Sequence, residues 1–181
     1  MLGKLATEVA TDRPDLLAPA VVTALAAWPA DAPVPVTDIL VAPIDPELAD
    51  TAAFCEAYDV ALDASANCVV VSGKREGDTR FAACMILATT RADVNGVVRR
   101  QLDVRKASFA PMAEAVELTG MEYGGITPVG LPADWPVYVD AAVAAADRVV
   151  IGSGVRRSKL TVPGALLTRL PGAAVIEGLG R

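Results

Sequence analysis

The stretch Thr119-Gly120-Met121-Glu122-Tyr123-Gly124-Gly125-Ile126-Thr127-Pro128-Val129-Gly130 carries the strongest signal in this sequence. Its adjacent glycines, Gly124 and Gly125, permit backbone angles and a close approach of other atoms that a Cβ would resist. Pro128 then stiffens the segment, so we predict an ordered loop and not a helix or a strand. Such a loop can offer N–H and C=O groups to a polar ligand, although a tight turn without any ligand explains the same residues.

A second segment of this kind follows, in which Val149-Val150-Ile151 runs into Gly152-Ser153-Gly154. The apolar run predicts a buried strand. The small residues at its end suit the wall of a ligand pocket, and equally an ordinary hairpin. Between the two segments, a strand predicted over Val137 to Val139 ends at Asp140. This carboxylate either faces a ligand or caps the helix predicted after it.

The elements around these segments alternate between the two kinds of periodicity. Cys68 to Ser72 and Phe81 to Thr89 flank a charged turn with two glycines, which predicts a β-hairpin. Helices are predicted over residues 16–28, 51–58, 94–100, 111–119, 141–146 and 164–170, and further strands over 36–43, 137–139, 148–152 and 160–162. Strands joined by hairpins and interrupted by helices predict an α+β domain with a mixed, mostly antiparallel sheet.

A length of 181 residues suits one well-buried domain. Pro29, Pro33 and Pro35 end the first helix, so residues 1–35 are predicted to be an acidic helical extension with a proline-rich linker, and residues 36–181 the main domain. Residues 1–63 contain 11 acidic and 2 basic residues, whereas residues 64–181 contain 11 acidic and 14 basic ones. The later part therefore tolerates a polyanionic partner better than the net charge of −6 suggests.

Two basic clusters lie in that later part, namely Arg99, Arg100, Arg105 and Lys106, and then Arg156, Arg157 and Lys159. Clusters of this kind can contact phosphates, although ordinary solvated surface explains each of them as well.

The chain contains no histidine, which excludes Ser-His-Asp and Cys-His catalysis and the usual hydrolytic zinc sites. Cys55, Cys68 and Cys84 form no CxxC pair and are expected to be reduced thiols. No apolar run reaches the roughly 18 to 20 residues that span a bilayer. The segment from Met1 to Glu8 lacks the features of a signal peptide. We therefore expect a cytoplasmic protein without a metal, a cofactor or a membrane partner.

Taken in order, these segments resemble the aminoacyl-tRNA deacylase family of the YbaK/ProX type, which includes the editing domains associated with prolyl-tRNA synthetase. The resemblance runs from about residue 50 to the C-terminus and is carried by residues 66–71, 92–102, 117–120, 124–130, 137–140 and 149–154. It implies a bent mixed sheet flanked by helices, and hydrolysis of the ester of a mischarged aminoacyl-tRNA that carries a small amino acid. Aminoacyl-tRNA is then the expected partner, and an aminoacyl-tRNA synthetase is allowed as a second one.

The resemblance also implies a site built largely from backbone groups, in which the ribose hydroxyl of the substrate or a bound water attacks the ester. Where the family carries a pocket-facing lysine, this chain has Asn67, which can hydrogen-bond but carries no charge. The implied site consists of Asn67 and Gly125 for catalysis, Gly124, Ile126, Thr127, Pro128, Asp140, Gly152, Ser153 and Gly154 for the aminoacyl group, and Arg99, Arg100, Arg156 and Arg157 for RNA.

Two alternatives stay open at this point. The chain could be an inactive member of the family that binds an aminoacyl group or a protein partner through the same pocket. It could also be a thiol hydrolase that uses Cys68, although no histidine is present to lower the pKa of that thiol. Lys74, on the turn after the strand of Asn67, is expected to be exposed to solvent.

Overall fold

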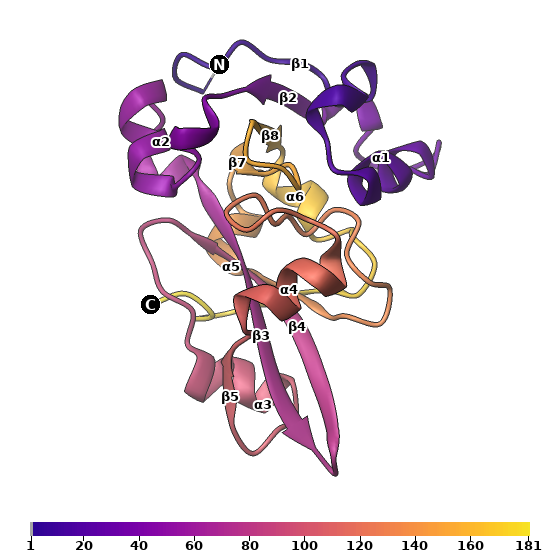
Figure 1. Cartoon of the computed structure of the whole chain (residues 1–181), viewed down its shortest axis with the longest axis vertical. Helices are drawn as coiled ribbons and strands as arrows, with labels where there is room; N and C mark the ends of the chain where they lie inside the picture. Colours follow the sequence, from indigo (N-terminus) through magenta and orange to yellow (C-terminus); the bar gives the residue numbers. More distant parts are fainter. Residues whose placement is uncertain (1) are drawn as a thin grey trace.

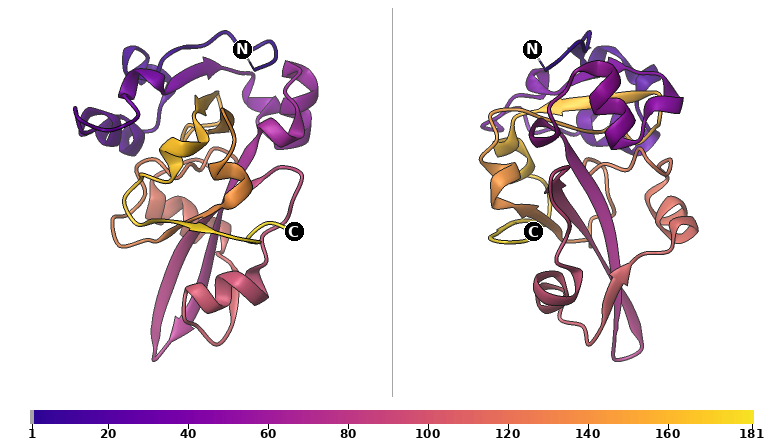
Figure 2. Two further views of the ribbon diagram at one scale, coloured as in Figure 1. Left: turned by 180° about the vertical axis from the view of Figure 1, so that it is seen from behind. Right: turned by 90° about the vertical axis from the view of Figure 1, so that its left-hand side faces the viewer.

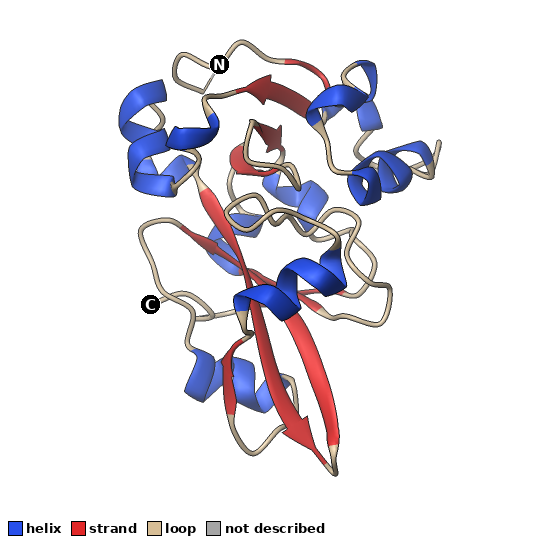
Figure 3. Ribbon diagram, viewed as in Figure 1, coloured by secondary structure: helices blue, strands red, loops and turns tan. Residues whose placement is uncertain are grey.

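The computed structural model describes residues 2–181, and residue 1 of the predicted N-terminal extension lies outside them. The described chain forms strands and short helices in an elongated molecule (Figures 1 and 3). The strands are β1 (Glu8–Val9), β2 (Leu40–Pro43), β3 (Ala66–Arg75), β4 (Asp78–Leu87), β5 (Ala107–Phe109), β6 (Val137–Asp140), β7 (Val149–Gly152), β8 (Ser158–Val162) and β9 (Ala173–Ile176). The α-helices are α1 (Pro19–Ala26), α2 (Thr51–Tyr58), α3 (Arg99–Gln101), α4 (Met112–Thr119), α5 (Ala141–Ala144) and α6 (Gly164–Leu167).

The strands divide between two sheets. The smaller sheet has the order β1-β2-β8-β7 and is antiparallel throughout. The larger sheet has the order β5-β3-β4-β6-β9, in which β6 pairs in parallel with both β4 and β9. An isolated parallel bridge between Ser65 and Val150 joins the two sheets just before β3 begins. The predicted α+β class with mixed, mostly antiparallel pairing is confirmed. The strands form two sheets that meet at this bridge, and not one sheet.

The predicted β-hairpin is confirmed, and its strands extend beyond the apolar runs that predicted them. β3 and β4 pair over ten residues each, from Ala66 opposite Leu87 to Arg75 opposite Asp78. The turn is only Glu76-Gly77, both with positive φ, as a type I′ hairpin turn requires. Successive β3 residues bury against different layers, because strand side chains alternate between faces. Val71 joins the core cluster that contains Val98, whereas Val70 packs with Ala115 of α4. The right-hand view of Figure 2 shows α3 and α4 on opposite sides of the hairpin.

The N-terminal residues share the core of the main domain. β1 pairs with β2, and Val21 and Leu25 of α1 are buried in the largest hydrophobic cluster. The helix begins later than predicted, since Pro19 occupies its first turn and Leu16 belongs to a preceding 3₁₀ turn. The division into residues 1–35 and 36–181 stays a prediction. Residues of the two parts pack extensively against each other.

Other predicted elements differ in detail. The strand predicted over residues 36–43 begins as the 3₁₀ turn η3 (Val36–Asp38) and becomes β2 only at Leu40. The helix predicted over residues 94–100 is a π-helical turn, η6 (Val94–Val98), followed by the single turn of α3. Asp93 caps this turn, because its carboxylate accepts hydrogen bonds from the N–H groups of Gly96 and Val97. Among residues 2–181 no helix has the length and apolar character to cross a membrane.

Candidate functional site

A cavity of about 300 Å³ opens where the two sheets meet. Its walls come from the first half of β3, the end of β7, the β5–α4 connection, the residues around the start of α2, and the loop around Gly124. The lining residues are Ala49, Asp50, Thr51, Ser65, Ala66, Asn67, Cys68, Val69, Val70, Phe109, Ala110, Met112, Ala115, Tyr123, Gly124, Ile126, Val150, Ile151, Gly152 and Lys159. Four of the predicted site residues therefore line one cavity, namely Asn67, Gly124, Ile126 and Gly152.

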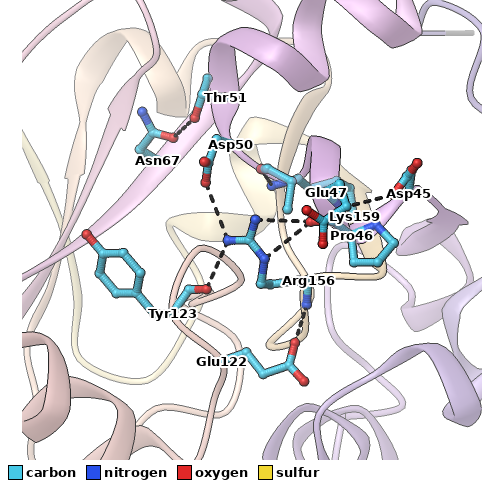
Figure 4. A network of polar contacts seen from close by, with 11 residues as sticks. Asp45, Pro46, Glu47, Asp50, Thr51, Asn67, Glu122, Tyr123, Arg156 and Lys159 are labelled. Carbon is cyan, nitrogen blue, oxygen red and sulfur yellow. Dashed lines mark hydrogen bonds and ion pairs between the residues drawn. The ribbon is translucent and has the colours of Figure 1, made fainter.

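Asn67 is fixed in the cavity wall by a hydrogen bond across to α2. Its Oδ1 atom accepts from the Thr51 hydroxyl at 2.7 Å (Figure 4). This bond uses the acceptor end of the amide. Among residues 2–181 the amide N–H groups of Asn67 have no partner, so they can donate to a carbonyl or hydroxyl oxygen in the cavity.

The two glycine segments of the sequence pack directly against each other. The N–H of Gly154 donates to the carbonyl of Gly125 at 2.7 Å. A Cβ on Gly152 would lie 2.3 Å from that same oxygen, and a Cβ on Gly125 would lie 2.6 Å from the backbone of Val155. These glycines are required for backbone-to-backbone contact, which sets the position of the loop beside β7.

Several predicted ligand contacts have structural roles away from the cavity lining. Asp140 accepts from Ala142 N at 2.9 Å and from Gly180 N at 2.7 Å, so it caps α5, the alternative considered above, and also holds the C-terminal segment. The Ser153 hydroxyl bonds within the β7–β8 turn, to Ser158 among others. Gly125, Thr127 and Pro128 are buried and do not line the cavity. Thr127 Oγ1 has no hydrogen-bond partner among residues 2–181.

Lys159 is a cavity residue that the sequence interpretation assigned to a surface cluster. It lies on β8, between β2 and β7, and is only 8% exposed. Its Nζ donates to the Ala49 carbonyl at 2.9 Å and lies 5.3 Å from the centroid of the Phe54 ring. Burial lowers the pKa of Lys159, and the positive charge of Arg156 lowers it further, against the opposing influence of Asp50 and Cys55.

Arg156 braces the edge of the cavity. Its guanidinium donates to the Pro46 carbonyl at 3.0 and 3.2 Å, to Asp50 at 3.4 Å and to the Tyr123 carbonyl at 3.4 Å (Figure 4). It thereby connects the approach to α2 with the loop around Gly124. Arg156, which is predicted to bind RNA, therefore lies at the edge of the cavity, and its guanidinium already has several partners within the protein.

The other predicted RNA-binding arginines lie elsewhere. Arg157 donates to the Asp15 carbonyl at 2.7 Å, on the side of the N-terminal extension. Arg99 and Arg100 belong to α3, beside β5 in the half of the molecule that contains the hairpin tip (Figure 1). The structure therefore brings only Arg156 of this set to the cavity. Lys74 is exposed near the hairpin tip and does not line the cavity.

Cys68 lines the cavity but is poorly suited to act as a nucleophile. Burial raises the pKa of its thiol well above the ordinary value, and neighbouring Cys84 raises it further. A thiol in this state carries almost no thiolate at neutral pH, and the thiolate is the reactive form. The geometry does not favour the thiol hydrolase alternative.

The mouth of the cavity carries exposed apolar and aromatic side chains. Phe109 is 62% exposed, Met112 is 57% exposed and Tyr123 is 59% exposed, and all three line the opening. Asp50 is the only acidic residue among the lining residues described here. Sequence reasoning missed Asp50 and Lys159 as site residues. Asp50 directly precedes a predicted helix, where an acidic residue usually caps the helix. Lys159 belongs to a basic cluster that ordinary solvated surface explains.

Comparison with known proteins gives a consistent picture. The family model of the aminoacyl-tRNA editing domain matches residues 45–170. A candidate trans-editing enzyme for prolyl tRNA synthetase superimposes with a TM-score of 0.71 at 21% identity, covering 89% of this chain and 97% of the other. A hypothetical protein gives a TM-score of 0.66 at 23% identity, covering 79% and 90%, respectively. A scaffold used for computational epitope grafting gives 0.72 at 21%, covering 88% and 95%.

No curated protein sequence matches the chain. The structural similarities, at these identities, concern the fold. The family match covers most of the chain and includes the strand of Asn67, the loop of Gly124 and the strand of Lys159. On this match, the resemblance noted in the sequence is confirmed, and the chain belongs to the aminoacyl-tRNA editing domain family.

Proposed function

We propose that this protein hydrolyses the ester bond of mischarged aminoacyl-tRNAs that carry a small amino acid. The observation that carries the proposal is the cavity between the two sheets, in which the loop of Gly124 meets β3 and β7. Its volume of about 300 Å³ is at the lower end of ligand pockets and suits an aminoacyl group.

The chemistry of the cavity lining supports an aminoacyl ester as the ligand. The apolar part of the wall consists of small and branched side chains, including Ala66, Val70 and Ala115, which suit a small aliphatic side chain. Asp50 offers a carboxylate to the α-ammonium group of the substrate. Asn67 offers amide N–H groups to one of its oxygens.

The exposed aromatic side chains at the mouth support a nucleic-acid end as the remainder of the ligand. Unstacked bases bind to aromatic faces, with about 1 to 3 kcal/mol per stacked base. Phe109 and Tyr123 stand where the terminal nucleotide of an acceptor end would lie if its aminoacyl group entered the cavity. A substrate of translation also implies the cytoplasmic location expected above.

The test is a deacylation assay on a panel of mischarged tRNAs that carry labelled alanine, cysteine, serine or proline. We expect hydrolysis above the buffer rate for at least one small amino acid. Tyr123→Ala should raise KM with little effect on kcat, whereas Leu118→Ala, another exposed apolar residue outside the cavity, should change neither. A folded protein without turnover across the panel would favour the alternative of an inactive family member that binds aminoacyl groups or a protein partner.

A further inference from the structure

The side chain of Lys159 is in an unusual electrostatic position. It is 8% exposed, and among residues 2–181 it forms no ion pair. Its hydrogen-bond partner is a neutral carbonyl, that of Ala49, although an ammonium group has three N–H donors. Burying a charge without a charged partner is costly. A titratable group perturbed by burial in a cleft is therefore a candidate for a functional use.

The place of Lys159 indicates what that use is. It is the only basic residue among the lining residues of the cavity, and it is held on β8 in the interior of the smaller sheet. The Ala49 carbonyl and the Phe54 ring restrict where its Nζ can lie. The ammonium is therefore fixed before a substrate arrives, which is the condition under which a charged donor stabilises a transition state most effectively.

We propose that Lys159 is a catalytic residue of the editing reaction, whose Nζ donates a hydrogen bond to the carbonyl oxygen of the aminoacyl ester and stabilises the negative charge that develops there. The inference rests on the function proposed above and assigns this role to a residue on β8. Asn67, on a strand of the other sheet, contributes a neutral hydrogen bond only.

The step balances without any further reactant. A water oxygen attacks the carbonyl carbon, and the π electrons of the C=O bond move onto the carbonyl oxygen, next to the Lys159 ammonium. The tetrahedral intermediate collapses, re-forms the C=O bond and breaks the bond to the ribose oxygen. A proton of the attacking water is transferred to that leaving oxygen. Lys159 keeps its own proton throughout, so its contribution is electrostatic.

The experiment compares Lys159→Met, Lys159→Arg and the matched control Lys74→Met, which removes an exposed lysine outside the cavity. Single-turnover deacylation is measured for each variant. Binding of a non-hydrolysable analogue, with an amide in place of the ester on the terminal adenosine, is measured in parallel. We expect Lys159→Met to lose about 100- to 1,000-fold in rate, the cost of one such donor. Analogue binding should weaken less than about tenfold, since its neutral carbonyl loses one ordinary hydrogen bond.

The pH profile separates this role from a structural one. Arg156, Asp50 and Cys55 are the charged or titratable groups that influence Lys159. Its lowered pKa predicts that the enzyme-catalysed rate, after subtraction of the buffer rate, falls at a less alkaline pH than an ordinary lysine would give. Lys159→Arg, which stays protonated, should keep a reduced rate without that fall.

The outcomes are distinct. If the wild-type protein is active and Lys159→Met deacylates at nearly the same rate, the catalytic role of Lys159 is overturned. The proposed function is left intact by that result. A parallel loss of rate, analogue binding and thermal stability in Lys159→Met would show that the lysine only supports the fold. A wild-type protein inactive on the whole panel would overturn the proposed function and, with it, this inference.

Discussion

Asn67 and Lys159 line the same cavity from strands of different sheets, and only Lys159 is charged. Asn67 is held by Thr51 at 2.7 Å, which makes the amide a positioned donor. Each side chain can therefore direct an N–H group at a substrate oxygen, and the cavity holds one positive charge. Because the cavity is small, a substitution at Asn67 or Lys159 that changes the number of charges should also change the deacylation rate.

Replacing Asn67 with lysine should reduce deacylation, because Asn67→Lys adds a second ammonium to the cavity. Like charges in one site disfavour each other, which lowers the pKa of both lysines. The measurement is the single-turnover rate, with Thr51→Val as the control that removes only the anchor of Asn67. A rate increase in Asn67→Lys would instead indicate that the natural chain is an impaired enzyme.

Replacing Asp50 with asparagine should weaken binding of substrates that have a free α-amino group. Asp50 is the only carboxylate among the described lining residues. Asp50→Asn therefore removes the group that we propose as the partner of the α-ammonium. We expect KM to rise by about tenfold, in line with the loss of one charge-assisted hydrogen bond. An N-acetylated aminoacyl-tRNA, which lacks this positive charge, serves as the control substrate. If KM rises equally for both substrates, Asp50 does not bind the α-ammonium, and its role is limited to its contact with Arg156.

At this scale the sequence identified part of the site. Asn67 and Gly124 were found because the residues around them follow a family pattern. Lys159 was missed because it follows Arg156 and Arg157 closely, and a run of like charges usually indicates solvent-exposed surface. Burial of Lys159 results from the interior position of β8, which depends on pairing with the distant strand β2.

The loop of Gly124 and the turn after β7 act as one unit, through contacts that leave no room for a Cβ. Gly125→Ala should destabilise the protein by several kcal/mol, since the added Cβ would lie 2.6 Å from the Val155 backbone. Gly120→Ala is the control, because its Cβ would meet nothing within 4 Å, although φ is +65°. Its cost should be only about 1 to 2 kcal/mol of backbone strain.

Chemical denaturation of both glycine variants measures the difference. If Gly125→Ala were no less stable than Gly120→Ala, the close packing of the loop against β7 would not be a determinant of stability, and the conformation of the loop would need another explanation.

Among the elements, those with local signals were predicted best. The hairpin follows from two apolar runs around a glycine turn, and α4 follows from the proline before it and the glycine after it. β9 was missed, because Ala173–Ile176 is a short segment whose pairing partner, β6, lies more than thirty residues earlier. The way in which the two sheets meet could not be predicted either, since the isolated bridge between Ser65 and Val150 connects residues that are far apart in the sequence.

For the molecule as a whole, the N-terminal residues behave as part of the core. Leu25 of α1 is 4% exposed, so Leu25→Ala should cost about 2 to 5 kcal/mol of unfolding free energy. Leu118 on α4 is 44% exposed, so Leu118→Ala should cost far less. Thermal unfolding of the two variants checks this. Equal stability would support an N-terminal extension that is independent of the main domain.

The stability of the whole molecule should also depend on pH through Lys159. Its pKa is lowered on folding from an ordinary value of 10.5. Between the lowered pKa and 10.5, the unfolded chain binds more protons than the folded chain, so the contribution of Lys159 to stability rises with pH in this window. Lys159→Met should lack this rise. Denaturation of both proteins across the window gives the difference, and parallel pH curves would contradict the prediction.

The long hairpin has a practical consequence. β3 begins at the cavity and ends at the turn Glu76-Gly77, nine residue steps away, which at about 3.3 Å per residue is roughly 30 Å. A Cβ at Gly77 would meet no other atom within 4 Å. A fluorophore or a biotin linked to a cysteine that replaces Glu76 would therefore lie far from the mouth of the cavity, where we propose that the nucleic acid binds. The hairpin tip is therefore a suitable position for attaching the protein to a surface and for measuring individual binding events with the proposed substrate.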